Sequence, residues 1–220
     1  MHPAILFFKR FPFAMLLCVQ LLSVLCYGFL TDSRTSHIIF NCLGLIVPML
    51  AVWVVYRSPA TNWIGFTLVT ASIGTTLLAL LGDQSQLLIW AQSFESLLYF
   101  YAAISLVMYM FKDDVVTLDE LYAAGATFTL LVWGFALVYS VCQQIYPNSI
   151  SGGTTGTQLR SWIELLFFSF SVQSGTGLSD LLPVSPQSRS IASIQMFSGV
   201  MYITVVVSHL VGLAASTKAK

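Results

Sequence analysis

The chain has 220 residues, of which 57% are hydrophobic and only 8% are charged. Water-soluble domains carry about 25% charged residues, so this composition excludes a protein that covers its own core with a hydrated surface. Nine basic and nine acidic side chains give a formal net charge of zero, which argues against nucleic acid as a partner. We therefore expect an integral membrane protein that is surrounded mainly by lipid.

Six apolar stretches have the length of a membrane-spanning helix, which needs about 20 apolar residues to cross a hydrocarbon core about 30 Å thick. Short polar segments connect the first five stretches, whereas a long interruption precedes the sixth. The sequence thus predicts an all-α membrane protein with six transmembrane helices, which cover approximately Phe11 to Leu30, His37 to Tyr56, Trp63 to Leu81, Leu87 to Phe111, Leu121 to Gln144, and Gln187 to Leu213.

The distribution of lysine and arginine predicts the orientation, because the cytoplasmic ends of transmembrane helices are enriched in these residues. Six basic residues fall on the side of the two termini and three on the opposite side, which favours cytoplasmic N- and C-termini. The first group is Lys9, Arg10, Arg57, Lys112, Lys218 and Lys220, and the second is Arg34, Arg160 and Arg189.

The fourth predicted span, Leu87 to Phe111, contains no lysine or arginine. A voltage-sensing helix moves several charges through the membrane field, each worth about 2.3 kcal/mol per 100 mV. The span therefore predicts weak voltage dependence. Its one charged residue, Glu95, is either a functional group or a carboxyl that forms a hydrogen bond inside the helix bundle.

The interruption between the fifth and sixth spans has the order of a pore loop. A polar segment rich in glycine, serine and threonine, Ile145 to Ser161, precedes a short apolar run, Trp162 to Phe170, that covers about half a bilayer. The segment Ser171 to Asp180 then contains two glycines and little apolar character. Irregular backbone at membrane depth is tolerated only where it is buried in protein or lines water. We therefore predict a re-entrant pore helix from about Ser161 to Val172, followed by a filter loop.

The stretch from Phe168 to Arg189 reads FSFSVQSGTGLSDLLPVSPQSR. It resembles the pore signature of tetrameric potassium channels, and it is similar in particular to small bacterial ion-channel-family proteins with six helices and no voltage sensor. In this resemblance Gly177 takes the place of the first filter glycine and Asp180 that of the family's aspartate. The resemblance implies that the filter consists of Ser174, Gly175, Thr176, Gly177, Leu178, Ser179 and Asp180. It also implies a monovalent cation at the backbone of Gly175, Thr176, Gly177 and Leu178.

Three filter positions depart from the family pattern. Gly175 stands where the family has a threonine hydroxyl, Leu178 replaces a tyrosine, and Ser179 replaces the second glycine. A left-handed serine costs roughly 1–2 kcal/mol, so we expect strain at Ser179. From these departures we expect poor discrimination between potassium and sodium. The combined substitutions Gly175→Thr, Leu178→Tyr and Ser179→Gly are expected to raise the preference for potassium.

The residues around the filter each have two interpretations. Phe167 and Phe168 fall where the family has an aromatic cuff around the filter, and contact with lipid is the alternative. Asp180 either joins a ring of carboxylates that concentrates cations, or pairs with Arg189 or with a neighbouring subunit. Gly199 is either a gating hinge or a small residue that allows close helix packing.

The last span carries polar residues at spacings of three, four and seven, which places them on one helix face. A polar face in an apolar span is expected to meet a cavity or another helix. We predict that this face lines the central cavity, and that His209 either responds to pH or lies at the membrane interface. The predicted lining residues of the inner helix are Gln195, Ser198, Gly199, Tyr202 and His209.

These features together imply a homotetrameric cation channel, because one chain supplies one pore loop and an ion needs a ring of ligands. The resemblance to the bacterial family and the compact size imply a bacterial inner membrane. Residues 1–120 would form a four-helix region and residues 121–220 the pore module. The expected partners are lipid and further copies of the chain, with K+ or Na+ as the permeant ion, no cofactor and no enzymatic activity. The alternative is a non-conducting or regulatory membrane subunit that retains the channel scaffold.

Overall fold

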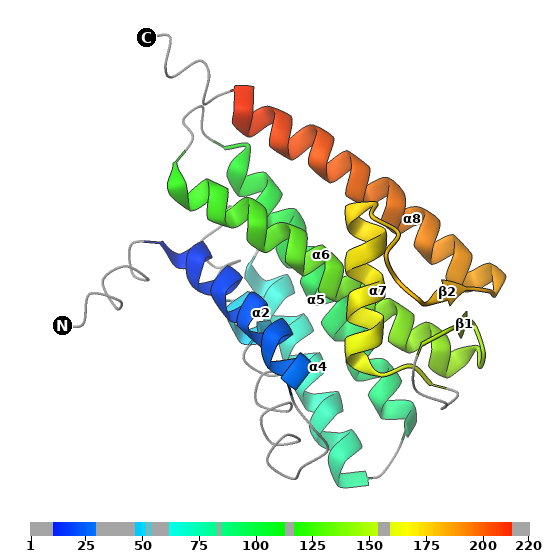
Figure 1. The fold of residues 1–220 in the computed structure, drawn as a ribbon. Helices are drawn as coiled ribbons and strands as arrows, with labels where there is room; N and C mark the ends of the chain where they lie inside the picture. The colour runs from blue at the N-terminus through cyan, green and yellow to red at the C-terminus, as the bar shows by residue number, and fades with distance from the viewer. Residues whose placement is uncertain are drawn as a thin grey trace, which may run out of the picture.

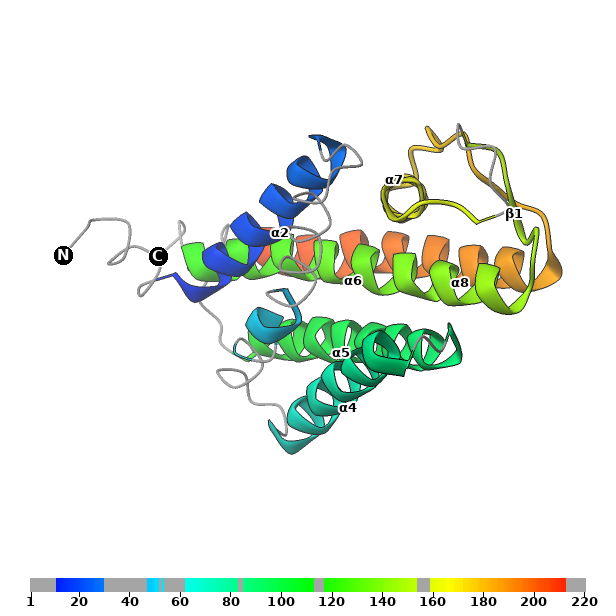
Figure 2. The same cartoon turned by 90° about the horizontal axis from the view of Figure 1, so that it is seen from below.

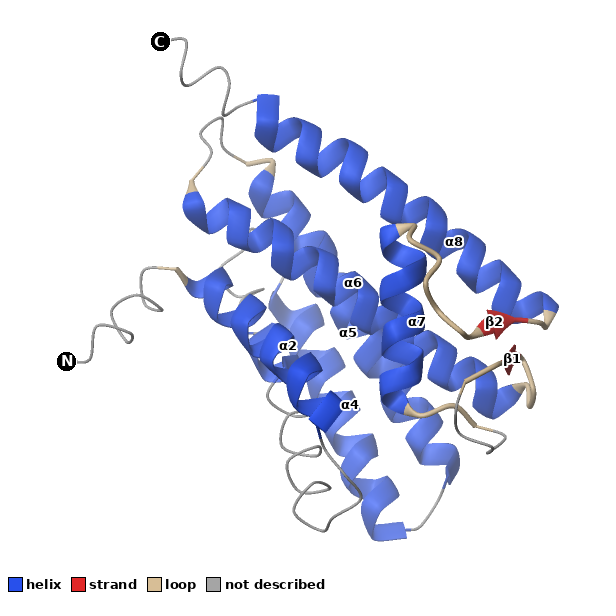
Figure 3. Cartoon of the chain, viewed as in Figure 1, coloured by secondary structure: helices blue, strands red, loops and turns tan. Residues whose placement is uncertain are grey.

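The computed structural model describes residues 11–29, 47–51, 53, 62–82, 85–112, 117–153 and 159–212. These residues are mainly helical (Figure 3). The helix after β2 continues through a π-helical turn, Ile203–Val207, to residue 212. The elements are α2 (Pro12–Phe29), α4 (Asn62–Gly82), α5 (Ser85–Met110), α6 (Leu118–Ile145), β1 (Ile150–Ser151), α7 (Trp162–Ser174), β2 (Leu182–Pro183) and α8 (Pro186–Tyr202).

Three of the described helices are long and apolar enough to cross a membrane, namely Gln86–Met110, Leu118–Ile145 and Pro186–Gly212. Shorter apolar helices occur at Pro12–Tyr27 and Trp63–Ala79. The predicted span from residue 37 to residue 56 lies mostly outside the described residues. Within this span the structure describes only residues 47–51 and 53, which are helical. The structure therefore confirms a predominantly helical chain with three helices of membrane-spanning length and composition in its described part.

Helix α6 is the centre of the arrangement, because it contacts α2, α5, α7 and α8. Figure 2 shows α4 and α5 on one side of α6 and α7 on the other, while α8 runs alongside α6. The largest side chain that is almost fully buried is Trp133 of α6, whose ring packs near those of Tyr99 on α5, Tyr27 on α2 and Trp162 on α7. The same hydrophobic core thus joins the N-terminal helices to the predicted pore module.

Local capping fixes where α7 begins. The Ser161 hydroxyl accepts a hydrogen bond from the Glu164 N–H (3.4 Å), and the Glu164 carboxylate accepts one from the Ser161 N–H (2.8 Å). This reciprocal arrangement satisfies two backbone donors that a helix start otherwise leaves unpaired. The observed helix, Trp162–Ser174, agrees with the short helix that the apolar run predicted and extends two residues beyond Val172.

Two short strands close the loop region, a feature that the all-α prediction did not include. Strand β1 pairs with β2 in antiparallel register, with Ile150 opposite Pro183 and Ser151 opposite Leu182. The Ser149 carbonyl accepts hydrogen bonds from the Val184 N–H (2.9 Å) and from the Ser188 hydroxyl (2.7 Å). These contacts tie the segment before α7 to the start of α8.

Candidate functional site

After helix α7 the chain forms an irregular loop, which returns to the end of the molecule where α8 begins. Figure 1 shows α7 ending beside the middle of α8, and the chain then running back to β2. The close approach is also clear at residue level, because a Cβ atom added to Gly199 of α8 would overlap the backbone carbonyl oxygen of Gln173 at the end of α7. The loop that follows α7 therefore starts next to the middle of a helix of membrane length.

A buried hydrogen-bond network fixes α7 between α6 and α8. The Tyr139 hydroxyl of α6 donates to Oε1 of Gln195 on α8 (2.8 Å), and Nε2 of Gln195 donates to the Ser169 hydroxyl oxygen on α7 (2.7 Å). The Ser169 hydroxyl in turn donates to the carbonyl oxygen of Val132 (2.7 Å). Tyr139, Ser169 and Gln195 are each 0% exposed. Sequence reasoning missed Tyr139 and Ser169, although polar groups inside apolar helices are a signal of such contacts.

The predicted filter residues lie together in one exposed stretch. Gly175 adopts φ +71° and ends α7 as its left-handed C-cap, and Gly177 adopts φ +66°. A Cβ at either position would have no neighbouring atom within 4 Å, so the glycines serve the backbone conformation and not close packing. The residues from Ser174 to Leu178 are exposed, and Leu178 is 75% exposed.

The expectation that Ser179 has a strained left-handed backbone is wrong. Within the described ranges, Asn148 is the one non-glycine residue with positive φ, so Ser179 does not occupy the left-handed region. Its N–H donates to the Ser171 hydroxyl oxygen (3.1 Å), and its own hydroxyl oxygen accepts from the Leu181 N–H (3.1 Å). The left-handed residues in this loop are instead the two glycines, Gly175 and Gly177.

The left-handed backbone at Gly175 gives the single substitution Gly175→Thr a cost in stability. A β-branched side chain is strained at φ +71°, so we expect the single substitution to lower the stability of the protein by roughly 1–2 kcal/mol. The measurement is the thermal unfolding midpoint of the purified protein in detergent. Gly74→Ala on α4 is the matched control, because that glycine has no positive φ and open space around it. A Gly175→Thr midpoint at or above that of the wild type would contradict this prediction.

The two predicted cuff phenylalanines have different environments. Phe168 is buried inside the subunit, and its ring centroid lies 4.8 Å from that of Tyr139 on α6. Phe167 is 48% exposed and is directed away from the subunit core. Contact with lipid is therefore excluded for Phe168 in this structure, whereas Phe167 is available to lipid or to a neighbouring chain.

The predicted polar face of α8 is directed inward and does not face outward to a cavity between chains. Gln195, Gly199 and Tyr202 are all buried within the subunit. The Tyr202 hydroxyl donates to the Ala124 carbonyl oxygen of α6, and its ring packs near Phe128. The prediction that these residues line the central cavity is thus corrected, because α6 and α7 cover them and supply the hydrogen-bond partners of Gln195 and Tyr202.

The two remaining residues of the predicted polar face, Ser198 and His209, make contacts within the subunit. The half-buried Ser198 hydroxyl donates to the Gln195 carbonyl oxygen (3.0 Å). His209 stacks on Phe111, with ring centroids 4.1 Å apart and an interplanar angle of 11°. Ser198 thus bonds to its own helix, while His209 packs against the end of α5.

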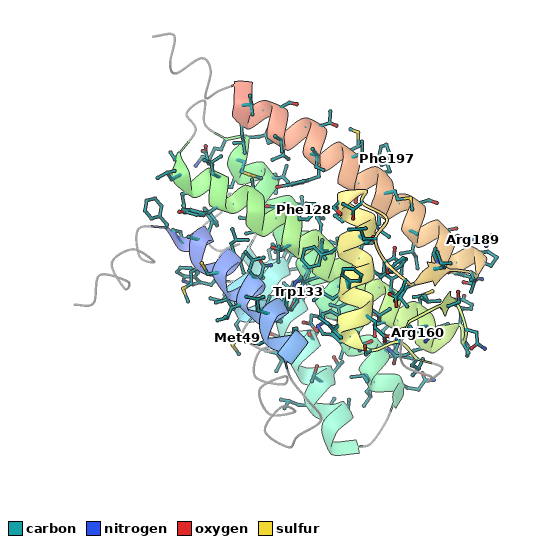
Figure 4. All side chains as sticks on the ribbon, viewed as in Figure 1. Met49, Phe128, Trp133, Arg160, Arg189 and Phe197 are labelled. Carbon is teal, nitrogen blue, oxygen red and sulfur yellow. The ribbon has the colours of Figure 1, made fainter. Side chains whose placement is uncertain are left out.

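The outward face of the last helix is mostly apolar, although the exposed Ser190, Ser193, Thr204 and Ser208 also lie along it, and sequence reasoning did not single it out. Figure 4 shows Phe197 on this side of the helix, and its side chain is 68% exposed. We call the exposed apolar residues of α8 and of its continuation to residue 212 the outer face of α8; this set comprises Ile194, Phe197, Val200, Met201, Val207 and Val211.

The pairing of Asp180 with Arg189 is not observed in the described part of the chain. The Arg189 Nε–H donates to the Pro183 carbonyl oxygen (3.1 Å), and Asp180 is exposed. Glu95, the carboxyl inside α5, accepts a hydrogen bond from the Tyr99 hydroxyl one turn later (2.8 Å). Asp180 therefore leaves its carboxylate open at the loop end, whereas Glu95 has a partner on its own helix.

No protein-family model, curated protein or solved structure matches this chain. Within the described residues, no group of three or more histidine, cysteine, aspartate and glutamate side chains is arranged to hold a metal ion. The oxygen atoms of the exposed loop include its backbone carbonyls, the Asp180 carboxylate and the hydroxyls of Ser174 and Thr176, whose oxygens lie 3.1 Å apart.

Proposed function

We propose that the chain is the subunit of a cation channel, in which four copies surround one pore and each contributes the loop from Ser174 to Asp180. The observation that carries the proposal is the short helix α7, which ends beside the middle of α8 and is followed by an irregular, exposed, glycine-containing loop. Irregular backbone is unstable in lipid, because its polar groups lack hydrogen-bond partners there, and it occurs at membrane depth only when protein covers it or water contacts it. In a ring of copies around a water-filled path, neighbouring subunits cover the loop and water contacts it.

The electrostatics of the loop favour a cation. The C-terminal end of a helix carries a partial negative charge, and α7 ends at Ser174, directly before the loop. Backbone carbonyls of the loop and the exposed hydroxyl oxygens of Ser174 and Thr176 are oxygen ligands suited to a dehydrated K+ or Na+. In a ring of four subunits, the open carboxylate of Asp180 concentrates cations at the entrance.

The outer face of α8 supports the assembly. It is a mostly apolar surface on the helix that borders the loop, and a closed ring needs each subunit to bind the next through two different surfaces. With six transmembrane helices and cytoplasmic termini, the loop opens to the outside of a bacterial inner membrane. Opening depends only weakly on voltage, because α5 carries no basic residue.

The test is current through a planar lipid bilayer that contains the purified protein. We expect a native mass of four chains, cation current, and a reversal potential that differs little between potassium and sodium. Asp180→Asn is expected to reduce single-channel conductance at low ionic strength and much less at high ionic strength, because salt screens surface charge. Monomers or dimers in native mass measurements would contradict the proposal.

A non-conducting or regulatory membrane subunit is the second candidate. The departures of Leu178 and Ser179 from the potassium-channel pattern, together with the 75% exposure of the apolar Leu178 side chain, favour it. This candidate predicts a tetramer without current, so the same bilayer measurement separates the two functions.

A further inference from the structure

The backbone of the exposed loop donates hydrogen bonds to one buried residue of α7, Ser171, which is 4% exposed. Its carbonyl oxygen accepts hydrogen bonds from the backbone N–H groups of Thr176 (3.2 Å) and Gly177 (3.5 Å). Its hydroxyl oxygen accepts the N–H of Ser179 (3.1 Å). One residue thus receives backbone donors from both the first and the second half of the loop.

The Ser171 hydroxyl also explains how a serine can occupy the position of the family's second glycine. The bond from the Ser179 N–H to Ser171 keeps Ser179 out of the left-handed region, and the Ser179 hydroxyl oxygen then accepts the Leu181 N–H. Two serines eight residues apart therefore set the direction of the backbone between Gly177 and Leu181. A glycine is unnecessary at residue 179 because no positive φ is required there.

We propose that Ser171 is a positioning residue of the pore, whose hydroxyl fixes the carbonyl groups that select the permeant cation. The inference rests on the proposed channel function. Selectivity depends on the number and placement of the carbonyl dipoles around the ion. Loss of the Ser171 hydroxyl leaves the Ser179 N–H without its acceptor, so the outer half of the loop moves and the cation sites change.

Ser169 provides a matched control on the same helix. It is also a buried serine, but its hydroxyl donates to the Val132 carbonyl oxygen and accepts from Gln195, and within the described residues its side chain makes no hydrogen bond to the loop. Ser169→Ala removes a hydroxyl from the same helix as Ser171→Ala does. Of the two, only Ser171→Ala removes a hydrogen-bond acceptor of the loop backbone.

The experiment compares wild type, Ser171→Ala, Ser171→Thr and Ser169→Ala in one bilayer assay. Ser171→Ala is expected to keep the native tetramer mass and to change the potassium-to-sodium permeability ratio about fivefold, the effect of one hydrogen bond. Ser171→Thr retains the hydroxyl and restores the wild-type ratio. Ser169→Ala lowers the thermal unfolding midpoint and leaves the ratio unchanged. A wild-type ratio in Ser171→Ala, or equal shifts in the Ser169 and Ser171 variants, would overturn the inference.

A second measurement keeps the inference testable if the wild type carries no current, a result that would refute the proposed function alone. Amide hydrogen exchange of the peptide from residue 174 to residue 181 reports on the loop without any conduction. Ser171→Ala is expected to speed exchange at Ser179 about fivefold, whereas Ser171→Thr and Ser169→Ala leave it unchanged. Unchanged exchange in Ser171→Ala would show that the hydroxyl does not hold the loop.

Discussion

Gly199→Ala is expected to disrupt the contact between α7 and α8 and to prevent stable assembly. The new methyl group would overlap the backbone carbonyl oxygen of Gln173, and neither backbone can move without shifting its whole helix. Overpacking of this kind costs about 1–3 kcal/mol and sometimes more. We expect a lower unfolding midpoint and, in size-exclusion chromatography of the detergent-solubilised protein, loss of the peak of the proposed tetramer.

Gly212→Ala is the control for this substitution, because Gly212 is also helical and a Cβ there meets no atom within 4 Å. Replacing a helical glycine by alanine in open space adds up to about 1 kcal/mol of stability. The comparison also decides between the two interpretations of Gly199. If Gly199→Ala remained as stable as the wild type and altered only conductance, the glycine would act as a hinge and not as a packing residue.

Gln195→Leu is expected to lower the free energy of unfolding by about 2–5 kcal/mol. The substitution leaves the Tyr139 hydroxyl without its acceptor and removes the two hydrogen bonds that Gln195 donates to the Ser169 carbonyl and hydroxyl oxygens, in a region from which water is excluded. An unsatisfied buried group costs about 1–3 kcal/mol, and each lost hydrogen bond about 0.5–1.5 kcal/mol. The measurement is chemical or thermal unfolding in detergent, monitored by tryptophan fluorescence.

Tyr139→Phe and the double variant complete a thermodynamic cycle with Gln195→Leu. We expect the two single effects to add to more than the double effect, because both remove the same hydrogen bond. Gln187→Leu is the control, since Gln187 lies exposed on the first turn of α8. A Gln195→Leu variant with wild-type stability and altered conductance would instead support the original prediction that Gln195 lines the cavity.

The local features of the chain were predictable because they depend on neighbouring residues. The apolar run after Ser161 predicted a short helix, and the structure has one at Trp162–Ser174. Its start is fixed by the bonds between Ser161 and Glu164, which are three residues apart, and its end by Gly175, which follows it directly. The three helices of membrane length were likewise visible as apolar stretches.

Tertiary contacts decided the orientation of the polar residues and the conformation of the loop. Helical spacing placed Gln195 and Tyr202 on one face, but spacing does not determine which helices cover that face. In the structure α6 and α7 cover it. The conformation of Ser179 depends on a hydrogen bond to Ser171, eight residues earlier. Sequence by itself thus determined which segments are helical and apolar, since those properties are local. The hydrogen-bond partners of buried polar groups were set only when distant segments came together, because a polar group buried away from water takes whichever partner the packed helices supply.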